Sequence, residues 1–496
     1  MKKKRNWDKT NGGKGNEIDV AMWHYLVLLL GAVVCSQNSN NSPLSGTITS
    51  PNYPKLYPNF NESTWDINVP EGYHVSLNFS VFDIEPSENC SCGFVKVMAD
   101  GKELGHFCGP MNSSAHPGNR QFVSQGNQMT IHFQSNFSEE MDGGIIPYKG
   151  FQAFYQAIVV TCEDPPVLTN GQYKFLTAPG NLEYESVIQY HCNSPYYYMV
   201  TPNGSDTFSC SAQRDWRDEH GGDKIPRCRP VCGKPENPVT SFGRILHGKK
   251  AEPGNFPWQV YVSRYGTAGG ALIGEQWVLT AAQVLPDNVE KQDLNDVLVY
   301  MGSLKMKNLM EMDTYPVEAF YMHPNFNRNN YDNDIALIRL KNPVVMNQNV
   351  SPICLPSPED EDDIYQKDRV GYVSGYGVTE SGKDANELRY VSVPVASRQA
   401  CKTYLNKKSP AFRYPSNKKY LFSRNMFCAG FPEGSLNKGD SCNGDSGGAY
   451  TSQNRQDTWV ATGLVSWGFG CGQGYGIYTK VSNYVDWIKS YVGEDA

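Results

Sequence analysis

The chain has 496 residues, and at roughly one domain per ~150 residues it is predicted to fold as several domains rather than one. Hydrophobic residues at 39% and aromatic residues at 12% exclude a disordered chain, and a mean hydropathy of -0.51 excludes a protein with many membrane spans. The net charge of -7, without a cationic stretch in the folded part, argues against nucleic-acid binding.

Residues 1–35 are predicted to be a secretory signal peptide. A basic stretch at 2–5 precedes an apolar run at 20–34, which is shorter than the ~20 residues needed to span a bilayer. The polar lead is long, so Met1 and Met22 both remain possible starts, and a membrane anchor is the less favoured alternative. Fourteen cysteines without the doubled CxxC pattern of a zinc site also predict an oxidising, extracellular location.

Asn-x-Ser/Thr sequons predict a glycoprotein if the chain is secreted. Most of them lie before residue 137, which predicts a glycan-rich first module. The sequons begin at Asn40, Asn61, Asn78, Asn89, Asn112, Asn136, Asn203 and Asn349. Asn349 is the poorest acceptor, because Pro352 follows Ser351.

Residues 36–158 are predicted to form a β-sandwich. Apolar and polar residues alternate in runs such as 75–81, and Pro, Gly and Asn turns separate the runs. The phrases SPNYPKLYPN, FDIEPSENC, LGHFCG and YKGFQAFYQA resemble a CUB domain over this whole stretch. The resemblance implies a Cys90–Cys108 bridge, which leaves Cys92 as a free thiol, a rearranged pair or a link to another chain.

Many CUB domains hold a calcium ion with one Glu and two Asp, because hard oxygen ligands suit a hard cation. Here Glu85 matches the family's Glu, but Gly93 and Asn136 stand where the two Asp residues are expected. Two of three carboxylates are missing, so we expect calcium binding to be unlikely and Glu85 to be an ordinary surface charge. No cofactor is expected for catalysis.

Residues 160–230 contain four cysteines, with Trp216 before the last of them, and a module this small needs disulfides for stability. The spacing and the Trp resemble a sushi, or complement control protein, module. The resemblance implies the bridges Cys162–Cys210 and Cys192–Cys228. The alternative is a generic disulfide-stapled spacer, which differs little in function.

Residues 231–244 are predicted to be an activation linker and residues 245–496 a catalytic domain. The motif GDSCNGDSGGAY places Ser446 in a Gly-rich turn, where the N–H groups of Gly444 and Ser446 could face one oxyanion. DNDIALIRL supplies Asp334. These motifs resemble the trypsin-like serine proteases, and the resemblance implies two six-stranded β-barrels. It also implies a carboxyl-terminal helix in NYVDWIKSYV, with Tyr484, Trp487, Ile488 and Tyr491 on one face. The whole chain is therefore expected to be mainly β.

The trypsin resemblance also implies a substrate pocket and three bridges. Asp440, six residues before Ser446, is expected at the base of the pocket, where it would select Arg or Lys. The pocket is completed by Ser466, Gly468 and Gly476. The implied bridges are Cys232–Cys354, Cys401–Cys428 and Cys442–Cys471.

Activation in this family requires cleavage after a basic residue and insertion of the new amino terminus beside a buried Asp. Arg244 followed by Ile245 fits the cleavage site, and Asp445 is the expected partner of the Ile245 ammonium. The usual Ile-Val-Gly-Gly reads Ile-Leu-His-Gly here, which predicts a less well fitted insertion.

The catalytic His is missing from its expected place in ALIGEQWVLTAAQVL. Gln283 follows the Ala-Ala pair instead, and an amide cannot take the serine proton because it does not titrate near neutrality. Loss of the base costs about 10^6 in turnover in subtilisin, so ordinary proteolysis should be absent. Neither His247 nor His323 is expected to substitute.

The module order and phrases such as SPYYYMV, DKIPRCRPVCGKPENPV and WVATGLVSWG resemble the r-type protease subcomponent of complement component one and its shorter relatives. This implies a plasma protein with extracellular, complement-type or haptoglobin-type protein partners. We expect a secreted, impaired protease homologue that binds rather than cuts. The alternatives are an active endopeptidase cleaving after Arg or Lys, if Gln283 is a sequencing or allelic variant or if a substrate His fills its place, and a protein whose main function is CUB binding.

Overall fold

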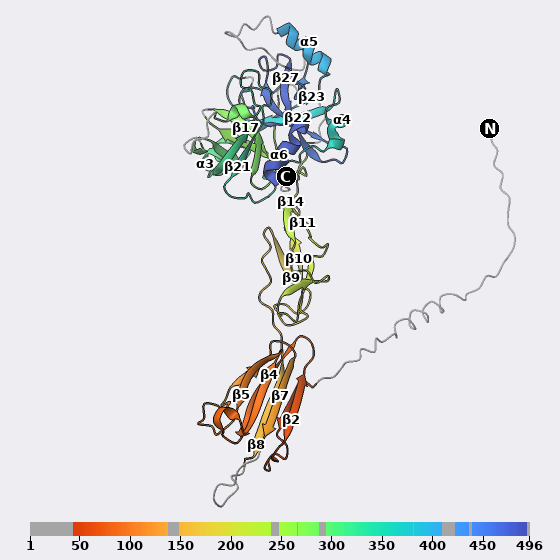
Figure 1. Cartoon of the computed structure of the whole chain (residues 1–496). Coiled ribbons are helices and arrows are strands. Elements are labelled where there is room, and N and C mark those ends of the chain that lie inside the picture. Colours follow the sequence, from red (N-terminus) through yellow and green to blue (C-terminus); the bar gives the residue numbers. More distant parts are fainter. Residues whose placement is uncertain are drawn as a thin grey trace, which may run out of the picture. The chain divides into compact units, whose positions relative to one another are not determined.

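The computed structural model describes residues 43–136, 148–239, 248–264, 266–286, 294–379, 381–408, 422–435 and 439–493 (Figure 1). The prediction of a mainly β protein is confirmed. The predicted signal segment, Asn40, Arg244, Ile245 and His247 lie outside the described residues. Within the described ranges, no helix is long and apolar enough to cross a membrane.

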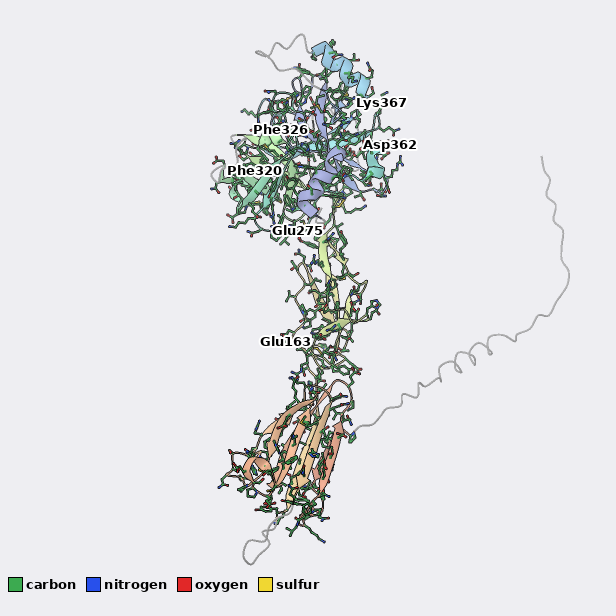
Figure 2. All side chains as sticks on the ribbon, in the orientation of Figure 1. Glu163, Glu275, Phe320, Phe326, Asp362 and Lys367 are labelled. Atoms are coloured by element: carbon green, nitrogen blue, oxygen red, sulfur yellow. A yellow bond between two sulfur atoms is a disulfide. The ribbon has the colours of Figure 1, made fainter. Side chains whose placement is uncertain are left out.

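The chain divides into two compact units. The first unit comprises the chain up to Glu163, which is labelled in Figure 2. Two short segments of the predicted sushi module, Leu182–Glu185 and Cys210–Asp215, also belong to it. The second contains the rest of that module, as Asp164–Asn181 and Ser186–Ser209, and everything from Trp216 onward.

The first unit is a sandwich of two four-stranded sheets. Their strand orders are β1-β8-β3-β6 and β2-β7-β4-β5. The elements are β1 (Ser45–Thr49), β2 (Glu62–Asn68), β3 (Tyr73–Asp83), η1 (Glu88–Cys90), β4 (Gly93–Ala99), β5 (Lys102–Phe107), β6 (Gln121–Val123), β7 (Gln128–Ser135) and β8 (Gly150–Val159).

The core of the sandwich follows the period of two that the sequence shows. In β3, Val75 and Leu77 are fully buried, and Ile131 and Phe133 are their counterparts in β7. The alternation changes after Phe79, where a register shift in the pairing of β3 with β8 leaves Val81 only partly buried. The inward side chains of both sheets therefore form one apolar layer.

The small module at 160–230 has a four-stranded sheet, β13-β12-β10-β9, and a two-stranded sheet, β11-β14. Its strands are β9 (Gly171–Phe175), β10 (Val187–Cys192), β11 (Tyr197–Val200), β12 (Thr207–Cys210), β13 (Trp216–Asp218) and β14 (Arg227–Pro230). Tyr190 and Phe208 are almost fully buried, and Trp216 is 7% exposed. A core this small agrees with the need for disulfide staples.

The carboxyl-terminal domain contains two sheets, of six and seven strands, with the orders β19-β16-β17-β18-β21-β20 and β15-β23-β22-β25-β26-β27-β24. The seventh strand is the short β15, which adds to the edge of the expected six. β15 is Lys249–Lys250. The strands of the six-stranded sheet are β16 (Gln259–Ser263), β17 (Thr267–Leu272), β18 (Trp277–Thr280), β19 (Leu298–Met301), β20 (Val317–Met322) and β21 (Ala336–Leu340). The others are β22 (Val370–Gly375), β23 (Arg389–Pro394), β24 (Met426–Gly430), β25 (Ala449–Gln453), β26 (Trp459–Trp467) and β27 (Tyr475–Lys480).

The domain's helices are short. They are η2 (Ala282–Val284), α3 (Met306–Glu311), η3 (Pro358–Asp360), α4 (Glu361–Ile364), α5 (Arg398–Lys408), η4 (Val481–Tyr484) and α6 (Val485–Val492). The expected carboxyl-terminal helix is present as α6, which buries Ile488 and Val492. Tyr491 was expected on the same face as Ile488 but is 40% exposed, and its ring lies against that of Tyr321.

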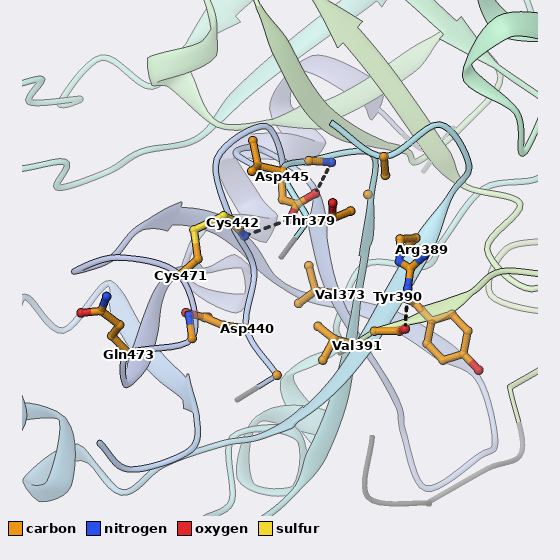
Figure 3. Close-up of a pocket in the computed structure, with 17 residues that line it drawn as sticks. Val373, Thr379, Arg389, Tyr390, Val391, Asp440, Cys442, Asp445, Cys471 and Gln473 are labelled. Carbon is orange, nitrogen blue, oxygen red and sulfur yellow. Dashed lines mark hydrogen bonds between the residues drawn. A yellow bond between two sulfur atoms is a disulfide. The ribbon is translucent and has the colours of Figure 1, made fainter. Parts of the chain in front are cut away.

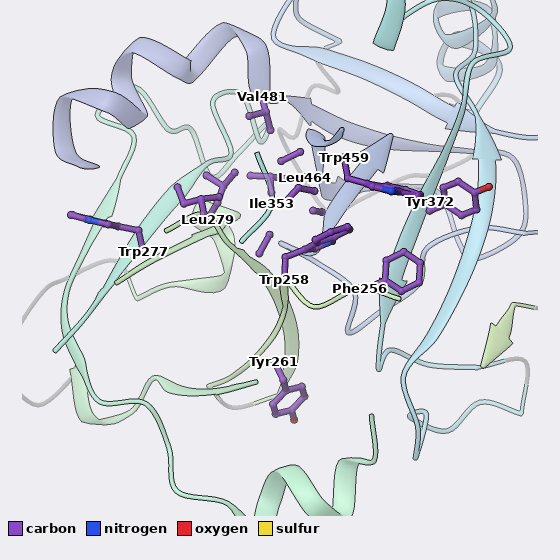
Figure 4. Close-up of a cluster of buried hydrophobic side chains, with 14 of the residues drawn as sticks. Phe256, Trp258, Tyr261, Trp277, Leu279, Ile353, Tyr372, Trp459, Leu464 and Val481 are labelled. Carbon is purple, nitrogen blue, oxygen red and sulfur yellow. The ribbon is translucent and has the colours of Figure 1, made fainter. Parts of the chain in front are cut away.

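An aromatic core joins the two sheets of this domain (Figure 4). Trp258, just before β16, and Trp459 of β26 lie with ring centroids 5.9 Å apart, and each is 1% exposed. Burial of a large apolar side chain contributes about 1.5–3 kcal/mol, so this pair helps fix the sheets, and the cleft between them, in one arrangement.

Six disulfides are present among the described residues. They are the pairs that the family resemblances imply: Cys90–Cys108, Cys162–Cys210, Cys192–Cys228, Cys232–Cys354, Cys401–Cys428 and Cys442–Cys471. Cys92 is a partly exposed free thiol. The segment that carries Cys232 lies along the carboxyl-terminal domain. Gly233 donates its N–H to the Pro352 carbonyl, and its own carbonyl accepts the N–H of Trp459.

Candidate active site

Asp334 is the buried centre of the candidate site. It precedes β21 and has no solvent exposure. Its Oδ1 accepts the backbone N–H of Gln283 at 2.9 Å, while its Oδ2 accepts the Gln283 side-chain amide at 2.6 Å and the Ser466 hydroxyl at 2.5 Å. Burial raises the Asp334 pKa to about 6, although these hydrogen bonds favour the charged form.

Gln283 lies on η2 with its side chain oriented by two acceptors. Its Nε2 donates to Asp334 and also to the Ser466 carbonyl, the latter at 2.6 Å. An amide nitrogen carries only two hydrogens, so both donors are used and only Oε1 is left to accept a proton donor. The amide therefore reproduces the hydrogen bond that orients a histidine toward this carboxylate, but not the basic nitrogen.

Ser446 and Gln283 line the same cavity of about 260 Å³, together with the predicted pocket residues Asp440, Ser466, Gly468 and Gly476. The structure thus brings seven predicted site residues together, because Asp334 contacts this group through Gln283 and Ser466. The arrangement places a hydroxyl, an amide and a carboxylate around one space. The described lining holds the Ser446 hydroxyl but no histidine that could serve as its base.

The turn before Ser446 depends on Gly444. Its φ is +93°, and a Cβ there would lie 2.9 Å from the Gly377 Cα. Within the described part of the chain, the N–H groups of Gly444 and Ser446 make no hydrogen bond to a backbone carbonyl, while Gly269 donates to the Ser446 carbonyl. Ser446 lines the cavity whereas Gly444 does not, so an oxyanion hole formed by both N–H groups stays a prediction.

Asp440 provides the negative group of the cavity. Its Oδ2 accepts the Gly472 N–H at 3.0 Å, and in the described structure its buried Oδ1 has no hydrogen-bond partner. Burial, helped by the charge of Asp445, raises the Asp440 pKa to about 7. A carboxylate that is costly to leave unpaired can bind a cation entering the pocket.

Asp445 faces a pocket of about 470 Å³, which shares Asp440, Cys442 and Cys471 with the lining of the Ser446 cavity (Figure 3). Its Oδ1 accepts the Gly377 N–H at 3.0 Å and its Oδ2 the Cys442 N–H at 2.9 Å. A Cβ on Gly375 would lie 2.0 Å from Oδ1, so the carboxylate needs glycine there. Burial raises the Asp445 pKa to about 6.

The predicted insertion of Ile245 beside Asp445 falls on residues outside those described. The first described residue after them, Gly248, lines the same pocket as Asp445, and its carbonyl accepts the Arg389 guanidinium at 3.0 Å.

His323 does not line the cavity of Ser446. Its ring lies 5.1 Å from that of Tyr484 and 5.2 Å from that of Trp487, beside the carboxyl-terminal helix, and burial lowers its pKa. The expectation that His323 does not replace the missing base is consistent with this position. His247 lies outside the described residues.

Sequence reasoning missed Arg328. Its guanidinium donates to the carbonyls of Gln283 and Leu285, at 3.3 and 3.0 Å, and its charge lowers the Asp334 pKa. The only sequence signal was an arginine within the Asn-rich loop shortly before Asp334. The structure shows that this loop holds the Gln283 turn, and its Tyr331 lines the cavity.

The doubtful calcium ligands of the first unit lie near one end of β4. Gly93 starts β4 and has no side-chain donor, while Asn136 uses its Nδ2 to donate to the Ser91 carbonyl. Glu85 donates its N–H to the Tyr57 hydroxyl, whose pKa burial raises to about 12. This donor set is poor in charge for a hard cation, so weak or absent calcium binding stays a prediction.

Comparison with known proteins gives matches over both ends of the chain. The CUB domain family matches residues 35–155 and the Trypsin family residues 245–488. Complement C1r-A subcomponent of Mus musculus is 31% identical, with 91% of this chain and 97% of the relative aligned. Complement C1r subcomponent-like protein of Homo sapiens is 37% identical over 92% and 91%, and its Rattus norvegicus counterpart is 38% identical over 90% and 92%. The predicted resemblance is confirmed.

Proposed function

Since the chain belongs to the complement C1r and C1r-like family of trypsin-type serine proteases, we propose that it is a secreted member whose protease domain binds proteins without cleaving them efficiently. One observation carries the proposal. The position of the general base holds Gln283, whose two amide hydrogens are donated to Asp334 and the Ser466 carbonyl. No histidine is among the described residues that line the cavity, and the Gln283 amide cannot take the Ser446 proton near neutral pH.

The binding half of the site supports the second part of the proposal. Asp440 keeps a buried oxygen without a hydrogen-bond partner in the described structure. A Cβ on Gly476 would lie 3.1 Å from that oxygen, so glycine at this position keeps the approach to it open. The chemistry fits an Arg or Lys side chain of an extracellular partner, of complement or haptoglobin type. Six disulfides and the sequons support a secreted glycoprotein.

The test uses the purified full chain after cleavage at Arg244. We expect no labelling of Ser446 by a fluorophosphonate and no hydrolysis of an Arg ester above background, together with saturable binding of an arginine-like cation such as benzamidine. The Asp440→Asn variant is the matched control, because it keeps the shape of the pocket and removes the charge. Labelling and ester hydrolysis at rates typical of serine proteases would falsify the proposal.

An active endopeptidase remains the second candidate, because Ser446, Asp334 and Asp440 are all retained around one cleft. A substrate that carries a histidine could supply the missing base. Cleavage restricted to peptides with a His near the scissile bond, and absent from matched peptides with Gln in its place, would distinguish this function.

A further inference from the structure

The first unit exposes an apolar patch on the outer face of the sheet β1-β8-β3-β6. Phe154, in β8, is 40% exposed and Val123, in β6, is 44% exposed, whereas the adjacent Ala153 is fully buried. Phe154 therefore points away from the core, as the period of two requires. Two exposed apolar side chains do not by themselves mark an interaction surface, so their neighbours on the sheet decide what covers them.

Asn78 lies within this patch. It is exposed in β3, directly opposite Phe154 on one neighbouring strand and Gln121 on the other, so that Val123 is its diagonal neighbour. Directly opposite Cβ atoms are about 4.5–5.5 Å apart and diagonal neighbours about 7–8 Å. Asn78 begins the sequon Asn-Phe-Ser, and its Phe79 points into the core at 8% exposure.

The Asn78 amide makes no hydrogen bond within the described structure, unlike three other sequon asparagines. Asn61 accepts the Ser63 hydroxyl, Asn136 donates to the Ser91 carbonyl, and Asn203 donates to Asp218. The side chains of Asn89, Asn112 and Asn349 share this feature within the described structure, and what distinguishes Asn78 is its place opposite the exposed Phe154 ring.

The outer face of the other sheet differs. Its exposed positions are polar and pair with each other: Thr64 with His132 at 3.0 Å and Thr130 with Asp66 at 2.7 Å. A cross-strand ion pair joins Lys96 to Glu103 at 3.2 Å. The four strands of that sheet have no exposed large apolar side chain. The face around Phe154 has polar pairs as well, Ser80 with Gln152 at 3.2 Å and Gln121 with Ser76 at 2.6 Å, but it also exposes Phe154 and Val123.

We propose that an N-linked glycan on Asn78 packs its first sugar on Phe154 and Val123 and covers this face of the first unit. The sugar comes from a lipid-linked pyrophosphate donor in the secretory pathway. The bond from sugar C1 to the phosphate oxygen breaks, a bond from C1 to Asn78 Nδ2 forms, and Nδ2 loses one proton while the lipid pyrophosphate leaves.

The occupant is a sugar because N-acetylglucosamine has an apolar C–H face, which can lie on the Phe154 ring, and polar edges, which stay in water. The glycan then closes this sheet face to protein partners. Partners of the first unit must meet the polar sheet or the loops. This inference is independent of whether the protease domain cleaves.

The test uses the full chain secreted from mammalian cells that are fed 13C-labelled sugars. Peptide mass after enzymatic release of glycans in heavy-oxygen water reports occupancy of Asn78. Ring currents of Phe154 should shift the N-acetyl methyl signal of its glycan upfield, and Phe154→Leu should abolish that shift. Phe60→Leu is the control, because Phe60 is another exposed aromatic, 75% exposed, beside the Asn61 sequon.

A kinetic measurement on the folded protein complements the spectra. Release of the Asn78 glycan by an endoglycosidase should be about two- to fivefold faster in Phe154→Leu, the range expected for the loss of one cross-strand contact. Release at Asn112 should not change. The proposal is overturned if Asn78 is unmodified in the secreted chain. It is also overturned if Asn78 is modified but neither its glycan signals nor its release rate change in Phe154→Leu.

Discussion

The two ends of the candidate cleft differ in what they retain. At the binding end, Asp440 and Asp445 keep buried carboxylates, each held by backbone N–H groups and each with a raised pKa. At the base end, Asp334 keeps three hydrogen bonds, but its partner is the amide of Gln283. The buried carboxylates at both ends keep their hydrogen bonds. A site can therefore lack its histidine base and still keep its local structure.

This contrast teaches that hydrogen bonding and proton transfer are separable. The Gln283 amide satisfies Asp334 and the Ser466 carbonyl, which avoids the cost of unpaired buried groups. The same side chain has no pKa near neutrality and cannot act as a base. Stability can thus be kept where catalysis is lost, and the following experiments test this separation.

The largest effect is expected from restoring the base. Gln283→His, in protein cleaved at Arg244, should raise hydrolysis of an Arg ester by about 10^3-fold or more, because the base is the main missing part of the triad. The measurement is steady-state hydrolysis before and after cleavage. Ser446→Ala in the same background is the control and should return the rate to background. Activity that stays at background would show a second fault, with the Ile245 insertion as the first suspect.

Cleavage itself should change the connectivity without separating the chain. Cys232 lies before Arg244 and is bonded to Cys354 after it. The cleaved protein should therefore run as one band in non-reducing electrophoresis and as two after reduction. A Cys232→Ser, Cys354→Ser double variant should give two bands in both conditions. Two bands from the unreduced parent protein would contradict the bridge.

The charge at the binding end should make cation binding depend on pH. Asp440 has a pKa of about 7, so it is mostly neutral below that pH and charged above it. Affinity for benzamidine should increase roughly tenfold between pH 6 and pH 8, because the charged fraction increases by that factor. Titration by fluorescence or calorimetry measures it. Asp440→Asn should bind weakly at every pH, and an equally steep profile in that variant would refute the assignment.

Asp445 should make the stability of the fold depend on pH in opposite directions before and after cleavage. These changes should be smaller than the effects above. In the uncleaved chain its folded pKa of about 6 is above the unfolded value, so its contribution favours the folded state below about pH 4 and is lost as the pH rises through 6. Insertion of the Ile245 ammonium should lower that pKa and reverse the trend. Melting temperatures of both forms between pH 4 and 7 measure this, with Asp445→Asn as the control. Identical slopes before and after cleavage would argue against insertion.

The smallest effect is expected from calcium at the first unit. Only Glu85 of the three expected carboxylates is present, so calcium near a millimolar should shift the melting temperature by less than about 1 °C. Magnesium at the same concentration is the control for ionic strength. A clear rise that is specific to calcium would mean that amide and carbonyl oxygens near Asn136 complete a site.

Much of the fold was predictable because local patterns repeat the physical period of the structure. The alternation at Val75 and Leu77 predicted the buried face of β3, and the cysteine spacings, through family resemblance, implied all six bridges. The pattern failed at Val81, because a register shift against β8 depends on the partner strand and not on β3 alone. It also misjudged Tyr491, since helical spacing gives a face but not how far the neighbouring sheet extends under it.

The sequence by itself determined the identities at the candidate site, above all that Gln283 stands where a base is needed. Only the tertiary structure decided how that amide is used, because Asp334, Ser466 and Arg328 come from distant segments and meet Gln283 through folding. It also decided that Asn78 stands opposite Phe154, since strand register, and not sequence distance, sets which exposed side chains are neighbours. Residue type fixes the chemistry that is possible, and packing fixes which groups are close enough to share it.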